Sequence, residues 1–562
     1  MRRYWVVALA VLTLLGVLSP PALAQAPAPK VTITGLIDTV TRITKNFEDE
    51  AFHGQDNAWV ARNRGVFTIT GEVGKAKGVL ALEIDLGWGQ TGLNESTVAH
   101  SGQTITSNAS SFGGLQAANT QAGMDLGVDT AGVIEIKNLY VEVPVPLIPF
   151  PTVARLGAQP FQVTYKVGVL ATTDYGGVWL SSTLAPWLKL NFTYAQVEED
   201  VIGANSASAA GVATGTQFFR GDDFFLAVTP DITVVKGLDV RPIYSLFYAV
   251  GNTATLARCR IRCAGQPSNG AGVVFNNATG TLVSGATAGA FGNNLTDQGT
   301  FEEYRHTFGI DTRWTFGPWY LDPTFLVQLG TYDVLKGPGA GAGNRLTVGK
   351  RQGDYSAMLV DVRGGYRTGP LFVQGYGMFA SGTSARDNMF NENHTYHPVN
   401  GDAAYLAGWT ELLSFGLDYF VGGNTAHGLG ENIGLGRSGR IQFGFWPTYT
   451  VTPEFDVYGR AHAAWTHKAV DTDAIATSKT ASYATAPCVS NSAGCGGDSR
   501  YIGAELDLGI TYRFAPGLTF DLVGGWLFAG SALDTTLVRN GVIVKEDAHD
   551  AQILSARLRY TF

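Results

Sequence analysis

Charged side chains recur at every second position in several stretches whose remaining positions are apolar. In Ala551–Phe562, the arginines Arg557 and Arg559 alternate with Leu558 and Tyr560. A period of two is that of a β-strand, because successive side chains point to opposite faces. A charged face opposite an apolar face suits a barrel wall with water inside and lipid outside. The chemistry open to such a lining is electrostatic: opposed charges across a narrow channel orient polar solutes and reject apolar ones.

The same alternation selects a set of candidates for the inner face of a barrel. They are Arg62, Arg64, Glu83, Asp85, Arg155, Glu303, Arg305, Asp311, Arg313, Asp361, Arg363, Arg460, Glu505, Asp507, Arg513, Arg557 and Arg559. For each residue the alternative is a charge that is solvated by water in the lumen and paired along the wall, with no part in selection.

The sequence carries no constellation of residues for catalysis or cofactor binding. Nucleophile-elbow and zinc-protease motifs are missing, and the glycines form no phosphate-binding loop. His462 and Ser555 are single candidates, and His394 and His397 lie in a polar loop, where solvated histidines are more common than metal ligands. We therefore expect no enzyme activity, no cofactor and no metal site.

Composition predicts that the strands belong to one closed barrel. Hydrophobic residues make up 45% of the 562 residues, charged residues only 15%, and glycine accounts for 71 positions. Beyond Ala24 there is no long apolar run, so a chain embedded in a membrane has only the closed barrel available, in which every backbone group is paired. The formal net charge of −8 argues against nucleic acid as a partner. A soluble sandwich or propeller is the alternative, but propellers show a more regular repeat length than these loops allow.

The N-terminal residues 1–24 have the pattern of a secretory signal peptide. Arg2 and Arg3 are the charged start, Val6–Leu18 is the apolar run, and Ala22-Leu23-Ala24 is the cleavage site. A membrane anchor is the alternative, but the apolar run is short for a membrane span. We expect a short lead-in at 25–30 and a single outer-membrane barrel at 31–562.

Short turns that contain proline or glycine alternate with long polar loops along the chain. The turns are 184–187, 316–319, 368–371, 452–455 and 515–518, with a less compact one at 229–238. The loops are 90–130, 199–216, 252–300, 332–353, 381–398, 470–499 and 531–548. Proline presets turn geometry and is expected to be excluded from central strands. Outer-membrane barrels have this asymmetry, with short turns in the periplasm and long loops outside.

Counting the alternating stretches predicts about 18 antiparallel strands, in a range of roughly 16 to 20. Residues 403–440 do not alternate cleanly, and a direct count gives an odd total, whereas bacterial barrels have even numbers. One strand in that region is therefore wrongly assigned by the pattern. A barrel of this size leaves an aqueous lumen, while eight strands would be filled by side chains.

Two close cysteine pairs fall in the predicted outer loops. They are Cys259 with Cys263 and Cys488 with Cys495. An even number of cysteines in an exported chain favours disulfides, and the spacings fit neither zinc sites nor haem attachment. We expect two local disulfides.

Two parts of the chain resemble bacterial outer-membrane barrels, and one of them resembles the general porins. Lys137–Val143 followed by Ala154–Phe161 is similar to the N-A-Y-V strand and the R-L-G-R-Q-P-F-like strand of that family, with Ala158 in place of a basic residue. Phe562 at the end of an alternating strand is similar to the assembly signal of outer-membrane barrels. In general porins the loop after the R-L-G-R-Q-P-F-like strand folds into the lumen as a constriction. The resemblance places this loop at Gln162–Tyr175, with Lys166, Asp174 and Tyr175 as constriction residues.

The predicted function is therefore that of a porin in the bacterial outer membrane, a water-filled channel for passive diffusion of ions and small polar solutes. The resemblance also implies a homotrimer surrounded by outer-membrane lipid and lipopolysaccharide. One alternative is a substrate-specific outer-membrane channel. Another is a barrel conduit that sheathes a periplasmic partner such as an electron carrier, which requires a wide, unobstructed lumen.

Overall fold

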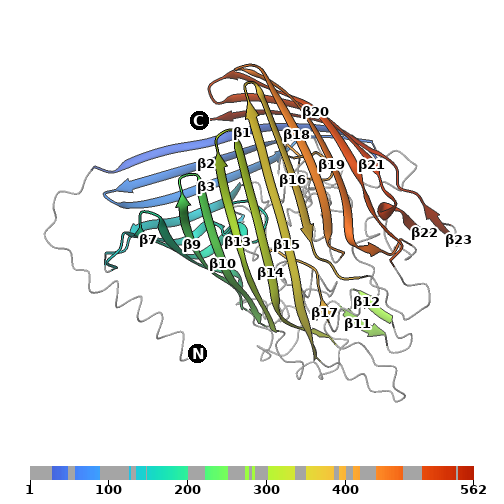
Figure 1. The fold of residues 1–562 in the computed structure, drawn as a ribbon, viewed down its shortest axis with the longest axis horizontal. Helices are drawn as coiled ribbons and strands as arrows, with labels where there is room; N and C mark the ends of the chain where they lie inside the picture. The colour runs from blue at the N-terminus through green and yellow to red at the C-terminus, as the bar shows by residue number, and fades with distance from the viewer. Residues whose placement is uncertain are drawn as a thin grey trace.

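In the computed structural model of the chain, most described residues belong to strands of one curved sheet (Figure 1). The structure describes residues 28–47, 57–88, 126–127, 134–146, 148–199, 222–250, 273–276, 281–284, 302–335, 350–384, 392–399, 409–414, 416–417, 438–472, 497–539 and 542–562. The predicted signal peptide and all four cysteines lie outside the described residues, so the structure does not bear on the expected cleavage or disulfides.

Long strands form the wall. They are β1 (Lys30–Lys45), β2 (Asn57–Val73), β3 (Ala76–Gly87), β5 (Ile134–Pro144), β6 (Thr152–Gln162), β7 (Thr172–Ala185), β8 (Leu188–Glu199), β9 (Asp222–Val235), β10 (Leu238–Val250), β13 (Glu302–Phe316), β14 (Trp319–Leu335), β15 (Lys350–Thr368), β16 (Leu371–Ala380), β18 (Arg440–Thr452), β19 (Phe455–Val470), β20 (Ser499–Ala515), β21 (Leu518–Ala529) and β24 (Ala551–Thr561). The short elements are β4 (Leu126–Gly127), β11 (Val273–Asn276), β12 (Thr281–Ser284), β17 (Glu392–Asn393), the 3-10 helix η5 (Ser531–Leu533), β22 (Thr535–Arg539) and β23 (Val542–Glu546).

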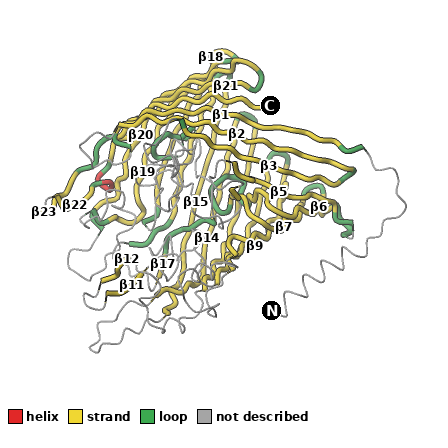
Figure 2. The backbone as a smooth tube through the Cα atoms, turned by 180° about the vertical axis from the view of Figure 1, so that it is seen from behind, coloured by secondary structure: helices red, strands yellow, loops and turns green. Residues whose placement is uncertain are grey.

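The sheet closes on itself because its first and last strands pair. Strand β1 is antiparallel to both β2 and β24, and Asp38 stands opposite Arg559 in the closing ladder. The backbones of Gly35 and Phe562 exchange hydrogen bonds of 2.9 and 3.0 Å at the seam. Figure 2 shows the C-terminus beside β1 and β21.

The number of wall strands in the described chain agrees with the sequence. The sheet has 20 strands, of which β4 and β17 are two-residue strands laid against β5 and β15, so 18 strands form the closed wall. The predicted antiparallel barrel of about 18 strands is therefore confirmed. Strand β16 pairs directly with β18, so no wall strand comes from the described residues between them, which is the region where the sequence pattern gave an odd count.

All five compact turns lie where the sequence predicts them, between β7 and β8, β13 and β14, β15 and β16, β18 and β19, and β20 and β21. Gly317, Gly369 and Gly517 have φ values of +61°, +53° and +77°, a region in which side chains other than glycine are strained. The sixth turn is shorter than predicted, because β9 continues to Val235 and only Lys236 and Gly237 separate it from β10. We call this end of the barrel the short-turn end and the opposite end the long-loop end.

The expectation that proline stays out of wall strands is wrong. Pro160, Pro230, Pro242, Pro323 and Pro447 lie within β6, β9, β10, β14 and β18. Pro230 and Pro242 fall at the same level, where the ladder between β9 and β10 skips from Val240–Ile232 to Tyr244–Val228. Each proline removes only one backbone hydrogen-bond donor from a ladder. The barrel tolerates this loss because the flanking ladders, β8 with β9 and β10 with β13, continue through the gap.

Side chains alternate between an apolar outer face and a polar inner face. On β13, Phe308 and Ile310 are 48% and 42% exposed, whereas Arg305 and Asp311 are fully buried inside. Aromatic pairs collect near the short-turn end on the outside, such as Trp314 with Phe316 and Trp319 with Tyr366, whose ring centroids are 4.4 and 4.2 Å apart. An apolar band that ends in aromatic residues is the surface that a bilayer requires. No helix among the described residues is both long and apolar enough to cross a membrane.

Candidate functional site

The interior of the barrel is the candidate site, and ladder register places charged side chains there. Asp521 on β21 stands opposite Arg557 on β24, and Arg460 on β19 opposite Asp507 on β20. Inner-face positions are occupied by Arg62, Arg64, Glu83, Arg155, Glu303, Arg305, Asp311, Arg313, Asp361, Arg363, Arg460, Glu505, Asp507, Arg557 and Arg559. Arg513 lies near the short-turn end of β20. Asp85 stands opposite Arg64 in the ladder, but its side chain is not among those described.

Most of these bases contact a carboxylate of the inner wall. Arg559 lies 2.5 Å from Asp38 and Arg557 lies 2.8 Å from Asp521, both across neighbouring strands. Further pairs are Arg64–Glu83, Arg155–Glu142 at 2.7 Å, Arg305–Glu303 at 2.8 Å, Arg313–Asp239 at 3.2 Å, Arg363–Asp361 at 3.2 Å and Arg513–Asp456 at 2.5 Å. Pairing lowers the cost of placing charges in a wall whose other side faces lipid.

The two members of a pair differ in their contact with water. The Arg559 side chain is 31% exposed and its partner Asp38 is fully buried. Arg513 and Asp456 are 43% and 12% exposed, and Arg155 and Glu142 are 32% and 17% exposed. In these pairs the carboxylate lies behind the base, so water in the lumen meets positive charge first.

Three segments fold inward and narrow the lumen. The first is the loop 163–171 between β6 and β7, which we call the inward loop. Its backbone reaches strands β10 and β13 of the wall, where Tyr165 N–H donates to Asp311 over 2.5 Å and Arg241 donates to the Val163 carbonyl over 3.0 Å. Val169 and Leu170 are completely buried. The inward course occurs in the stretch for which the porin resemblance suggests a constriction, although Asp174 and Tyr175 belong to strand β7 and not to the loop.

Lys166 anchors the inward loop to strands β14 and β15. Its ammonium group lies 2.8 Å from the Asp361 carboxylate and donates to the carbonyls of Asp322 and Asp361 over 2.7 and 3.0 Å. Beside it, the guanidinium groups of Arg241 and Arg313 lie 4.0 and 4.3 Å from the ring centre of Tyr165. Burial raises the pKa of the Tyr165 hydroxyl, so the ring stays neutral between two cations. The stacked ring and the buried ion pair make this a fixed loop.

The second inward segment, residues 393–399, lies on the inner surface of β14 and β15. Gln328 Nε2 donates to the His397 carbonyl over 2.9 Å, and its Oε1 accepts the His397 N–H over 3.0 Å. Tyr396 donates to the Val169 carbonyl of the inward loop over 2.7 Å. The first two segments are therefore joined to each other as well as to the wall. His394 and His397 belong to this packed segment, and no cluster of potential metal ligands occurs among the described residues.

The third inward segment, which we call the insert, contains the described residues 409–414 and 416–417 and is bound by the β18–β20 wall. Glu505 accepts the backbone N–H groups of Leu412 and Leu413, each over 2.7 Å, and Asp507 accepts that of Glu411 over 3.1 Å. Arg460 lies 3.3 Å from the Glu411 carboxylate. Burial raises the pKa of Glu411 to about 7.

Side chains also fix the start and end of the insert. His462 lies between Tyr376 and Thr410, whose hydroxyl oxygens are 2.7 and 2.9 Å from its two ring nitrogens. At the other end, Arg557 donates to the Leu417 carbonyl over 2.5 Å. His462 and Ser555, the single catalytic candidates of the sequence, are thus buried wall residues. Sequence reasoning missed the insert; its only signal is the loss of strand alternation in 403–440.

Together these features define a transmembrane antiparallel β-barrel whose lumen is charged and narrowed by inserted segments. No protein-family model and no curated protein matches the chain. Among solved structures it is similar to Pseudomonas aeruginosa OccK8 (OprE), with 11% identity, a TM-score of 0.45 and coverage of 95% of this chain and 98% of that one. It is also similar to Acinetobacter baumannii OccAB1, with 10% identity, a TM-score of 0.43 and coverage of 95% of this chain and 96% of that one. Function is therefore inferred from the lumen itself.

Proposed function

We propose that this protein is a porin that lets ions and small polar solutes diffuse passively across the bacterial outer membrane. The observation that carries the proposal is the inner wall of paired charges, partly in contact with water, inside a barrel with an apolar outer face. Such a wall replaces part of the hydration of a polar solute and offers nothing to an apolar one. We also infer export through the predicted signal peptide and assembly as a homotrimer.

Three of the ion pairs in this wall favour anions. In the pairs of Arg559, Arg513 and Arg155 the base is the more exposed member. A solute in water therefore approaches the cation more closely than the carboxylate behind it, although the whole chain is formally acidic.

The inserted segments favour a channel with selectivity for particular solutes over a general one. The inward loop, residues 393–399 and the insert are buried against different parts of the wall and reduce the free cross-section. They also count against the conduit for a periplasmic partner, which would need that space.

A planar lipid bilayer experiment tests the proposal. The refolded protein is added to the bilayer and single-channel current is recorded in a salt gradient. We expect stepwise conductance and a reversal potential of the sign for anion preference. A folded barrel that carries no current would refute the open channel, and the opposite sign would refute the anion preference.

A further inference from the structure

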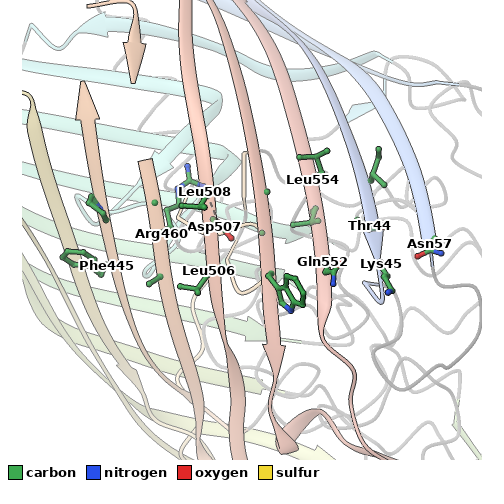
Figure 3. Close-up of a pocket in the computed structure, with 18 residues that line it drawn as sticks. Thr44, Lys45, Asn57, Phe445, Arg460, Leu506, Asp507, Leu508, Gln552 and Leu554 are labelled. Atoms are coloured by element: carbon green, nitrogen blue, oxygen red, sulfur yellow. Dashed lines mark ion pairs between the residues drawn. The ribbon is translucent and has the colours of Figure 1, made fainter. Parts of the chain in front are cut away.

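The outer face of the barrel is hollowed over the strands from β18 to β2. The groove has a volume of about 790 Å³ and is lined on the outside by Phe445, Leu506, Leu508, Leu554 and Ile43 (Figure 3). This volume lies within the range of small-molecule sites, roughly 300–1,000 Å³. Most of the outward side chains of the groove wall are apolar.

Two glycines on the outer face create the hollow. Gly459 on β19 and Gly524 on β21 flank the outward leucines of β20, of which Leu508 is 75% exposed. A Cβ atom at Gly524 would have its nearest neighbours at 3.9 Å, and one at Gly459 would lie 3.6 Å from Leu508. Neither glycine is thus needed for close backbone packing. The result is two furrows with a leucine ridge between them.

The groove is polar only toward the long-loop end. Across β21, β24, β1 and β2, the ladders place Trp526, Gln552, Lys45 and Asn57 side by side. The row two residues nearer the short-turn end is Gly524, Leu554 and Ile43. Two residues of a strand span about 7 Å, so one row of polar groups caps an otherwise apolar groove. In Figure 3, Lys45, Gln552 and Asn57 lie together on one side of the groove, away from Phe445.

We propose that this groove binds the acyl chains of the anionic glycolipid of the outer leaflet, lipopolysaccharide. Its two furrows each take a chain, and Lys45 with Gln552 and Asn57 contacts a phosphate of the headgroup. The carboxylate of nearby Asp550 is already engaged, because it accepts the Ala529 N–H over 3.0 Å and lies 3.4 Å from the Trp526 indole nitrogen. The assignment to the outer leaflet rests on the proposed outer-membrane orientation, with the long loops outside.

A second copy of the chain fits this surface less well than lipid does. The leucine ridge stands above two separate furrows, and a neighbouring barrel, which is itself convex, would meet the ridge before it filled either furrow. Flexible chains fill both sides of a ridge independently. The location of the only lysine of the groove at its long-loop end matches the position of lipid phosphates relative to their chains.

The experiment measures lipid retained by the full-length protein in non-ionic detergent after addition of purified lipid A, by native mass spectrometry. The variant Gly459→Leu/Gly524→Leu fills both furrows, Lys45→Gln removes the charge, and Gly71→Leu is the matched control. Gly71 lies on β2 in a separate outer hollow, where a Cβ would meet no atom within 4 Å. We expect lipid A on the unmodified protein and on the control, at least a tenfold loss in the filled variant, and a smaller loss in Lys45→Gln.

Several results would overturn the proposal. One is equal retention of lipid A by the filled variant. Another is equally tight, groove-dependent binding of phosphatidylglycerol, which would remove the glycolipid assignment. A change in oligomeric state by light scattering, with lipid retention unaltered, would make the surface an interface between copies. Conductance is also recorded for every variant, and it should not change because the groove faces outward. An unmodified protein that carries no current would refute the porin function without changing the amount of bound lipid A.

Discussion

Glu505 is the residue whose change should most directly alter the width of the channel. Its carboxylate accepts the N–H groups of Leu412 and Leu413 at 2.7 Å each, and both partners lie in the buried insert. A hydrogen bond to a charged group contributes about 1.5–3 kcal/mol, so the two together stabilise the docked insert by roughly 3–6 kcal/mol. In Glu505→Gln one carbonyl faces two donors, and at least one of these bonds is lost.

The loss of one such bond, about 2 kcal/mol, shifts the ratio of docked to undocked insert by more than tenfold. Because an undocked insert leaves a wider lumen, we expect a larger mean conductance and more frequent switching between current levels in the bilayer recording. Leu412 or Leu413 would also be left with a buried N–H that has lost its acceptor, which lowers the melting temperature of the barrel.

A matched control is Glu454→Gln, because this exposed residue in the turn between β18 and β19 makes the same chemical change far from the insert. Folding of each variant is checked by its heat-dependent migration on denaturing gels. A folded Glu505→Gln protein with unchanged conductance and unchanged switching would refute the view that Glu505 holds the insert against the wall.

Three further predictions follow from the geometry of the lumen and wall. Raising the pH from about 5 to about 8 should increase conductance. Burial raises the pKa of Glu411 from 4.5 to about 7, so the docked insert binds a proton that the undocked insert releases. The docked state is therefore destabilised by up to about 3 kcal/mol as the pH rises through this window. Glu411→Gln should weaken that dependence, and an identical pH profile in the variant would contradict the role of Glu411. The double variant Arg559→Gln/Arg155→Gln should move the reversal potential toward cation preference, whereas the control Lys75→Gln in an exposed turn should not. Equal reversal potentials in the unmodified protein, the double variant and the control would count against anion selection by these two arginines. Gly157→Ala should prevent folding, because Gly157 has a φ of +120° and an added Cβ would collide with the Leu139 carbonyl. The control Gly78→Ala should fold, because an added Cβ there meets no atom within 4 Å. Gel migration distinguishes folded from unfolded protein, and a folded Gly157→Ala barrel would contradict the reasoning on Gly157.

The strands of the barrel wall were predictable because the sequence pattern that specifies each of them is local. Each strand shows its own period of two, and each compact turn carries its own proline or glycine, as at 316–319. Prolines within strands were not predictable, because whether Pro242 can be tolerated depends on the ladder of β10 with β13 on its other side. The pattern states which residues face inward but not which strands are neighbours.

The inserted segments lack a local signal of this kind. The insert resembles a polar loop in sequence, and its burial is produced by Glu505 and Asp507, which lie about 90 residues later in the chain. Likewise, Lys166 in the inward loop pairs with Asp361, which lies 195 residues later in the chain. Such contacts join distant parts of the chain, so neither periodicity nor turn chemistry reports them.

Under the proposed function, folding and selection of solutes use the same charges in this lumen. A carboxylate such as Asp38 is buried and would be costly alone, so Arg559 must lie beside it for the seam between β1 and β24 to close. Because Arg559 is the member of the pair that reaches water, the side chain that neutralises the seam is also the one that a solute meets. Arg559→Gln should therefore weaken the closing seam and the anion preference together. Asp38→Asn removes the buried charge instead; it should weaken the seam but strengthen the anion preference, because Arg559 then acts on the lumen without its counter-charge. Opposite effects of the two variants on the reversal potential, with stability lowered in both, would separate the electrostatic role of the pair from its structural one.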